Sequence, residues 1–223
     1  MTDPTPPTPM LIDAPDDVPL ATVLLAHGAG AAMDSAAMTA LSRALARAGL
    51  RCLRFEFTYM AARREGGSRR PPPKAEKLVP EYLEAVAALG DDPATRPLLI
   101  GGKSMGGRVA SLVADGLRDA GRIDGLLCIG YPFHPPKRPE VPRTAHLADL
   151  GTPTLICQGT RDPFGTEAEV AGYALSPAIE TLWLPDGDHD LKPRKRLTGL
   201  THAQHLDRAA EAAAGFARRL AAY

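Results

Sequence analysis

The sequence predicts an α/β protein with a mostly parallel sheet flanked by helices on both faces. Short apolar runs of strand length alternate with longer segments of helical period along the chain. The length of 223 residues suits one such domain with a sizeable core. No linker or repeat divides the chain. In sheets of this kind, ligands bind beyond the carboxyl ends of the strands, so the residues that follow each strand matter most.

Each expected strand is a short apolar run, and the expected helices lie between the strands or after the last one. The strands cover residues 21–28, 50–57, 97–103, 123–131, 152–159 and 179–185. The helices cover residues 34–49, 75–89, 104–121, 165–175 and 201–220. The first helix has the clearest pattern, because Met38, Leu41 and Leu45 recur at spacings of three and four. Asp34 or Ser35 can cap its start, and Gly49 can end it.

Residues 1–17 are expected to form a flexible, proline-rich tail, and residues 18–223 a single domain. The first ten residues, MTDPTPPTPM, have neither the basic start nor the apolar block of a secretory signal. No apolar run approaches the ~20 residues needed to cross a bilayer, so no membrane partner is expected. The three cysteines lie in apolar, strand-like runs without paired spacing, which predicts buried thiols and favours a cytoplasmic location.

The charges of the chain balance. There are 26 Lys and Arg residues and 26 Asp and Glu residues, so the net charge is zero. A chain built mainly to bind nucleic acid needs a positive excess to meet the phosphates. Nucleic acid is therefore not an expected partner.

The segment LIGGKSMGGRVA, residues 99–110, allows two interpretations. A phosphate-binding loop has the pattern Gly-x-x-x-x-Gly-Lys-Ser, and it would indicate phosphoryl transfer. Gly102, Lys103 and Ser104 fill its last three places, but the first place falls on Pro97. The residues between are mostly bulky and apolar, which is typical of a strand, and a strand cannot wrap its amides around a phosphate. The phosphate-loop interpretation is therefore disfavoured.

The same segment fits Gly-x-Ser-x-Gly, which presents a nucleophilic serine on a sharp turn between a strand and a helix. Gly102, Ser104 and Gly106 occupy the defining places, and the expected strand and helix flank them. Small residues are needed there because the strand and the helix come close. Ser104 is therefore the predicted nucleophile.

A serine nucleophile needs a base, and the base needs an orienting carboxylate. Asp162 follows the fifth expected strand and His189 follows the sixth, which gives the chain order serine, acid, histidine. All three residues should meet at one edge of the sheet. Other candidates for the base and the acid fit less well. His134 precedes the acid in the chain, and His202 and His205 fall within the last expected helix. The aspartates next to His189 favour turn or surface roles: Asp186, Asp188 and Asp190.

Acyl transfer also needs hydrogen-bond donors for the developing oxyanion. One is expected to be the amide of Met105, directly after the nucleophile. The second is expected from the loop HGAG after the first strand, where Ala29 is the choice and Gly30 the alternative. His27 in this loop is expected to brace it rather than to transfer a proton.

These residues together resemble the α/β-hydrolase superfamily, from residue 21 to the end of the chain. The stretches FTYM, RRPPPK, GGKSMGGR and GYPFHPP are similar to a small hydrolase-like family with testis-expressed and chromatin-complex relatives in animals. The chain is also similar in size to dienelactone-hydrolase-like proteins, which use a cysteine where Ser104 stands here. The resemblance implies the α/β-hydrolase fold and hydrolase activity, and it leaves the substrate open.

The surroundings of Ser104 suggest a rather open, shallow site. Residues 134–151 are too few for a lid domain and rich in proline. Possible pocket residues are Gly30, Tyr59, Lys103 and His134. The basic segment 63–74 could attract an acidic substrate, or could be a solvated loop. The basic segment 192–196 is expected to be a solvated loop.

The function predicted from the sequence is hydrolysis of a carboxylic ester or thioester by a Ser-Asp-His triad, without a metal or cofactor. The expected partner is a small acyl substrate, and a monomer and a homodimer are both open. The alternative is a hydrolase-like scaffold or binding module with little turnover.

Overall fold

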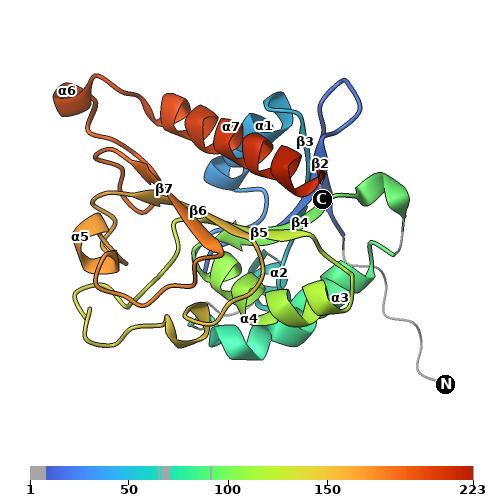
Figure 1. Ribbon diagram of the computed structural model, residues 1–223, viewed down its shortest axis with the longest axis horizontal. Coiled ribbons are helices and arrows are strands. Elements are labelled where there is room, and N and C mark those ends of the chain that lie inside the picture. The colour runs from blue at the N-terminus through green and yellow to red at the C-terminus, as the bar shows by residue number, and fades with distance from the viewer. Residues whose placement is uncertain (1–8, 65, 67–70, 91, 223) are drawn as a thin grey trace.

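The computed structural model describes residues 9–64, 66, 71–90 and 92–222 of the chain. A seven-stranded sheet forms its centre, in the order β1-β3-β2-β4-β5-β6-β7 (Figure 1). All neighbouring strands run parallel except the pair of β1 and β3, which is antiparallel. The strands are β1 (Leu11–Asp13), β2 (Ala21–Ala26), β3 (Leu50–Phe55), β4 (Leu98–Lys103), β5 (Gly125–Ile129), β6 (Thr154–Gly159) and β7 (Ile179–Leu184).

Helices cover both faces of the sheet, as expected for this fold class. Figure 1 shows α1 and α7 on one side, and α2, α3 and α4 on the other. The α-helices are α1 (Ala36–Arg47), α2 (Thr58–Arg64), α3 (Val79–Ala87), α4 (Met105–Asp119), α5 (Glu167–Val170), α6 (Lys195–Thr198) and α7 (His202–Leu220). Short 3-10 turns are η1 (Ala75–Leu78), η2 (Pro93–Thr95) and η3 (Ala145–Leu147).

The predicted elements are present, with differences at their ends. All six predicted strands form, each a little shorter at one or both ends than expected. The helix expected over residues 75–89 begins as the 3-10 turn η1, and the one expected over 165–175 is only the four-residue α5. The helices α2 and α6 were not expected, and each overlaps one end of a basic segment, 63–74 or 192–196.

The core consists of two apolar layers, one on each face of the sheet. Successive side chains of a strand point to opposite faces, so Leu24 joins the layer beneath α3 and α4 while Val23 and Leu25 join the layer beneath α1 and α7. All six residues of β2 are buried, as in a strand covered on both sides. The α7 layer is rich in alanine, which brings the helix close to the sheet.

The N-terminal strand corrects one expectation. The tail was expected to extend to residue 17, but Leu11–Asp13 pair with β3 at the edge of the sheet. The Asp13 carboxylate accepts hydrogen bonds from Arg54 at 2.7 Å and from Ser42 at 2.6 Å. Arg54 is buried, so Asp13 compensates a charge that the fold has removed from water. Residues 1–8 of the expected tail lie outside the described residues.

The connection between β5 and β6 forms no lid domain over the carboxyl ends of the strands. Among the described residues it contains only the turn η3. Within the same described ranges, no helix combines the length and the apolar character needed to cross a bilayer.

Candidate active site

Ser104 stands at the junction of β4 and α4, in a backbone conformation with φ 52° and ψ −117°. A positive φ is uncommon for a residue with a side chain, so the turn is strained. Neighbouring glycines permit it, because strand and helix touch through their backbones. A Cβ atom on Gly102 or Gly106 would lie 2.5 or 2.4 Å from the Ala26 carbonyl oxygen.

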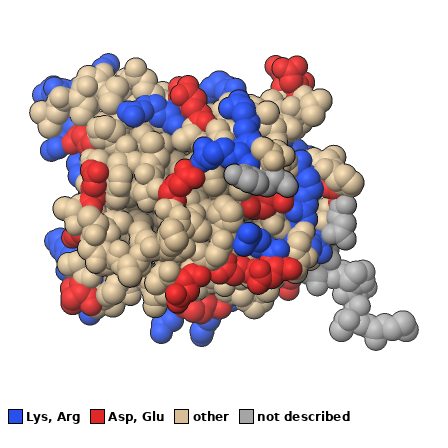
Figure 2. All heavy atoms as spheres, viewed as in Figure 1, with Lys and Arg blue, Asp and Glu red and all other residues tan. Residues whose placement is uncertain are grey.

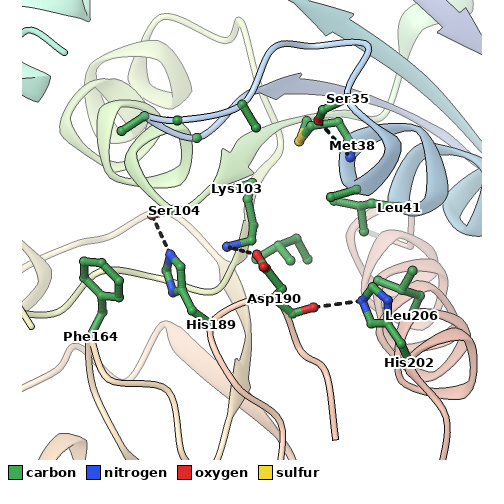
Figure 3. Close-up of a pocket in the computed structure, with 16 residues that line it drawn as sticks. Ser35, Met38, Leu41, Lys103, Ser104, Phe164, His189, Asp190, His202 and Leu206 are labelled. Atoms are coloured by element: carbon green, nitrogen blue, oxygen red, sulfur yellow. Dashed lines mark hydrogen bonds and ion pairs between the residues drawn. The ribbon is translucent and has the colours of Figure 1, made fainter. Parts of the chain in front are cut away.

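A chain of hydrogen bonds leads from Ser104 through His189 to Asp162. Ser104 Oγ lies 2.8 Å from His189 Nε2 (Figure 3). His189 Nδ1 lies 2.8 Å from Asp162 Oδ2. An ionised carboxylate only accepts, so Nδ1 carries the proton and Nε2 is free to accept from the serine hydroxyl. The structure thus brings together the three residues predicted for the triad.

Asp162 is fully buried and held by two further donors. The amide of Phe164 donates to Oδ1 at 2.8 Å, and Gln158 Nε2 donates to Oδ2 at 3.0 Å. Gln158 is itself buried on β6, so the carboxylate is placed by the sheet. Its three hydrogen bonds compensate for its removal from water.

The three aspartates that surround His189 in the sequence have other partners. Asp186 pairs with Arg194, and Asp188 accepts the amides of Asp190 and Lys192 at 2.9 Å. These contacts shape the turn that carries His189. The His189 ring also lies against Phe164, with 4.2 Å between ring centroids. The imidazole is therefore positioned by contacts on several sides.

The amides expected to hold an oxyanion have no acceptor among the hydrogen bonds found in the described residues. Met105 is the first residue of α4, and the first amides of a helix have no partner within it. Ala29 lies in the loop after β2, beside the cavity at Ser104. Its carbonyl accepts a hydrogen bond from the Tyr59 hydroxyl at 3.1 Å, which fixes the orientation of this loop.

His27 braces the same loop from below. Its Nδ1 lies 2.7 Å from the Gly28 carbonyl, and its Nε2 accepts the Phe57 amide at 3.1 Å. Because the backbone requires one donor and one acceptor, the ring is neutral. Burial lowers the pKa of His27, in agreement with that state.

A cavity of about 300 Å³ opens beside Ser104. It is mostly apolar, and its walls come from the loop after β2, from α1, from the start of α7 and from the loops that carry Phe164 and His189. Of the residues expected to line a pocket, Gly30 and Lys103 do so. The expectation is wrong for Tyr59 and His134. Tyr59 lies behind the loop it supports, and His134 is buried against Pro135 and Glu169.

Lys103 points into this cavity, where its ammonium group faces Asp190 (Figure 3). The Nζ to Oδ1 distance is 3.3 Å. Burial lowers the pKa of Lys103, although Asp190 acts in the opposite direction. Burial alone would raise the pKa of Asp190, but Lys103 outweighs this effect and the pKa is lowered. The two groups therefore stabilise each other's charge.

The described residues of the two basic segments do not line the cavity. Arg64 at the end of α2 pairs with Asp34 and Glu56, and Arg194 pairs with Asp186. Arg69 and Arg70 lie outside the described residues. Figure 2 shows Lys and Arg side chains next to Asp and Glu side chains on the face in view. In their described parts, both segments are tied by ion pairs to acidic neighbours.

Several residues of the site were not found from the sequence. Gln158 carried a signal, a polar residue inside an apolar strand run, that points to a buried hydrogen-bonding role. Phe164 follows Asp162 by two residues and could have been expected near it. The walls formed by Met38 on α1 and Leu206 on α7 gave no such signal, because their helical spacing is equally typical of core packing.

Comparisons with known proteins agree with this architecture. Est1E from Butyrivibrio proteoclasticus superposes with a TM-score of 0.69 at 17% identity, over 96% of this chain and 94% of that one. A dienelactone hydrolase from Anabaena variabilis ATCC 29413 has a TM-score of 0.67 at 21% identity, over 93% and 89%. An α/β serine hydrolase without a lid from Xanthomonas campestris has a TM-score of 0.63 at 20% identity, over 89% and 87%.

At these identities the likeness to solved structures shows the fold alone. A family comparison goes further, because the model of a family described as alpha/beta hydrolase domain matches residues 19–218. That match covers nearly the whole chain. The protein therefore belongs to the alpha/beta hydrolase domain family and is a hydrolase.

Proposed function

We propose that the protein is a serine hydrolase of small carboxylic esters or thioesters. The observation that carries the proposal is the hydrogen-bonded chain from Ser104 through His189 to the buried Asp162. A serine hydroxyl alone is a weak nucleophile, and a histidine oriented by a carboxylate is the arrangement that activates it.

In this mechanism Ser104 Oγ attacks the carbonyl carbon of the substrate while His189 Nε2 accepts the hydroxyl proton. The carbonyl π electrons move to oxygen, and the resulting oxyanion is held by the amides of Met105 and Ala29. The intermediate collapses, the alcohol or thiol leaves with the proton from His189, and an acyl-Ser104 ester forms. Water then attacks that ester with His189 as base, which releases the acid and restores Ser104.

The cavity supports a small substrate. A volume of about 300 Å³ lies at the lower end of the range for small-molecule sites. Its walls are mostly apolar, so a short acyl chain or a ring is the expected occupant. The uncovered edge of the sheet supplies access without a lid movement.

The proposal is tested with a fluorophosphonate probe and with 4-nitrophenyl acetate. We expect the folded protein to be labelled on Ser104 and to release a burst of nitrophenolate, and Ser104→Ala should abolish both. The matched control is Ser111→Ala, because Ser111 on α4 also lies 2.9 Å from a histidine nitrogen, Nε2 of His146, but does not line the cavity. That variant should keep labelling and turnover.

The same experiment tests the alternative of a scaffold or binding module. A folded wild-type protein that neither reacts with the probe nor hydrolyses any ester or thioester of a short-chain panel would support the scaffold and contradict the enzyme. Full turnover by Ser104→Ala would contradict the assigned nucleophile. Comparison of matched oxygen and thiol esters then separates esterase from thioesterase activity.

A further inference from the structure

The cavity holds one buried ammonium group among mostly apolar walls. Lys103 precedes Ser104 in the chain, and its side chain is only 14% exposed. Lysine is rarely buried to this extent unless a partner compensates its charge. Gly130 lies close by, and a Cβ atom on it would stand 3.2 Å from Lys103 Nζ. The glycine thus leaves the room that the ammonium group occupies.

The hydrogen-bonding capacity of Lys103 is only partly used. An ammonium group carries three N–H donors. In the described part of the chain its one ion-pair partner is Asp190, at 3.3 Å. Because one N–H group faces a single carboxylate oxygen of Asp190, two donors are left for a ligand in the cavity. A buried cation with free donors next to a nucleophile is a ready binding point for an anionic oxygen.

Asp190 is a partner that a ligand can replace. Its side chain is 57% exposed, so the carboxylate can turn into water at little cost. Its backbone is held separately, because the Asp190 carbonyl accepts a hydrogen bond from His202 Nε2 at 2.9 Å (Figure 3). Rotation of the side chain therefore does not require the His189 turn to move.

We propose that Lys103 forms a subsite for a carboxylate carried by the substrate, so that the preferred substrates are esters or thioesters with a free carboxylate. This inference rests on the proposed hydrolase function. The reacting carbonyl oxygen is directed to the amides of Met105 and Ala29, so a neutral ester offers Lys103 no charged acceptor. A carboxylate supplies one, and in an apolar cavity such a charge-assisted hydrogen bond is stronger than in water.

The test compares matched ester pairs that differ in one carboxylate. For the acid part the pair is mono-4-nitrophenyl adipate and 4-nitrophenyl hexanoate. For the alcohol part it is 4-acetoxybenzoate and its methyl ester. We expect the wild-type protein to favour the carboxylate member in at least one pair, and Lys103→Met to lower that kcat/KM ratio by about 10- to 100-fold. The pair that responds identifies which part of the substrate contacts Lys103.

Two further variants make the result specific. Asp190→Asn removes the competing carboxylate and should raise the same ratio, because Lys103 then lacks its internal partner. Lys195→Met removes an exposed lysine in α6, away from the cavity, and should leave ratio and activity unchanged. A wild-type preference for the neutral member in both pairs would overturn the proposal. So would a ratio that Lys103→Met does not change.

The readouts separate this inference from the proposed function. Hydrolysis of the neutral esters depends on Ser104 and tests the enzyme, whereas the ratio within a pair tests the subsite. If no ester is hydrolysed, the enzyme assignment fails and calorimetry with adipate tests the subsite alone. Adipate binding that Lys103→Met weakens would support the subsite. Equal binding by the wild-type protein and Lys103→Met, or no binding by the wild-type protein, would overturn it.

Discussion

Asp162 Oδ2 lies 2.8 Å from His189 Nδ1. The Asp162 carboxylate also accepts hydrogen bonds from the Phe164 amide and from Gln158 Nε2. Asp162 is thus an acceptor on both oxygens in a fully buried place. An amide at this position would direct an N–H group at another donor. The arrangement requires the ionised acid.

The variant Asp162→Asn should therefore lose turnover while it keeps the overall fold. The amide would favour the wrong tautomer of His189, and the expected fall in kcat is about 10²- to 10⁴-fold. Steady-state kinetics with 4-nitrophenyl acetate measures it. Asp207→Asn changes a half-buried side chain on α7 that does not line the cavity, and this control should retain activity. Near-normal turnover of a folded Asp162→Asn would rule out Asp162 as the orienting acid.

Gly106 is expected to tolerate no side chain. A Cβ atom there would lie 2.4 Å from the Ala26 carbonyl oxygen and 2.7 Å from that of His27, so Gly106→Ala must push α4 away from β2. The expected destabilisation is about 1–3 kcal/mol or more, with loss of activity. Urea unfolding measures it.

The matched control for that change lies on the same helix. A Cβ atom on Gly116 meets nothing within 4 Å, and alanine is the better helix former. Gly116→Ala should raise the free energy of unfolding by about 0.5–1 kcal/mol. If Gly106→Ala proved as stable as Gly116→Ala, the close contact between α4 and β2 would be refuted.

The thiols should be unreactive in the folded protein. Cys52, Cys128 and Cys157 are fully buried, and burial raises the pKa of Cys52 and of Cys157 to about 12. Burial raises the pKa of Cys128 as well. Since only the thiolate reacts, a disulfide reagent at pH 8 should detect no thiol until denaturant is added, and then three.

Ester hydrolysis should likewise resist iodoacetamide, which separates a serine enzyme from a cysteine enzyme. Rapid loss of activity with alkylation of one cysteine in the native protein would show that a thiol is accessible and required. Mass spectrometry of the treated protein identifies the modified residue.

The edge strand β1 should matter for stability through Asp13. Its removal leaves the guanidinium of Arg54 buried without its carboxylate. Asp13→Ala is expected to lower the free energy of unfolding by about 2–4 kcal/mol. This loss is somewhat smaller than for a fully buried ion pair, because Asp13 is partly exposed. Chemical denaturation measures this change. Asp16→Ala, an exposed carboxylate nearby, should change it little, and equal effects of both variants would contradict the role of the pair.

Much of the fold could be predicted because the relevant signals are local. Alternating strand and helix patterns gave the parallel sheet, and the residues after successive strands gave Ser104, Asp162 and His189, which the structure brings together at one edge. Parallel strands place their carboxyl ends side by side, so position along the chain was enough.

The parts that escaped prediction depend on contacts between distant residues. The strand β1 has three residues and no readable period, and its Asp13 meets Arg54, 41 residues away. Tyr59 and His134 follow strands, as the site residues do, but neither lines the cavity: Tyr59 donates to the Ala29 carbonyl, and His134 is buried against Pro135 and Glu169. The walls supplied by α1 and α7 arise from packing, which helical spacing alone does not reveal.

The backbone contact between β4 and α4 also sets how this site can diversify. Ala26 and its neighbours occupy the space of any side chain at Gly102 or Gly106, and Ser104 is fixed by its partners. Within the five-residue turn, Lys103 is the residue besides Ser104 that lines the cavity, because the Met105 side chain packs against the core. Libraries aimed at new substrates should randomise Lys103 and spare the rest of the turn, since variation at Gly102 or Gly106 destabilises the fold and variation at Ser104 removes the nucleophile.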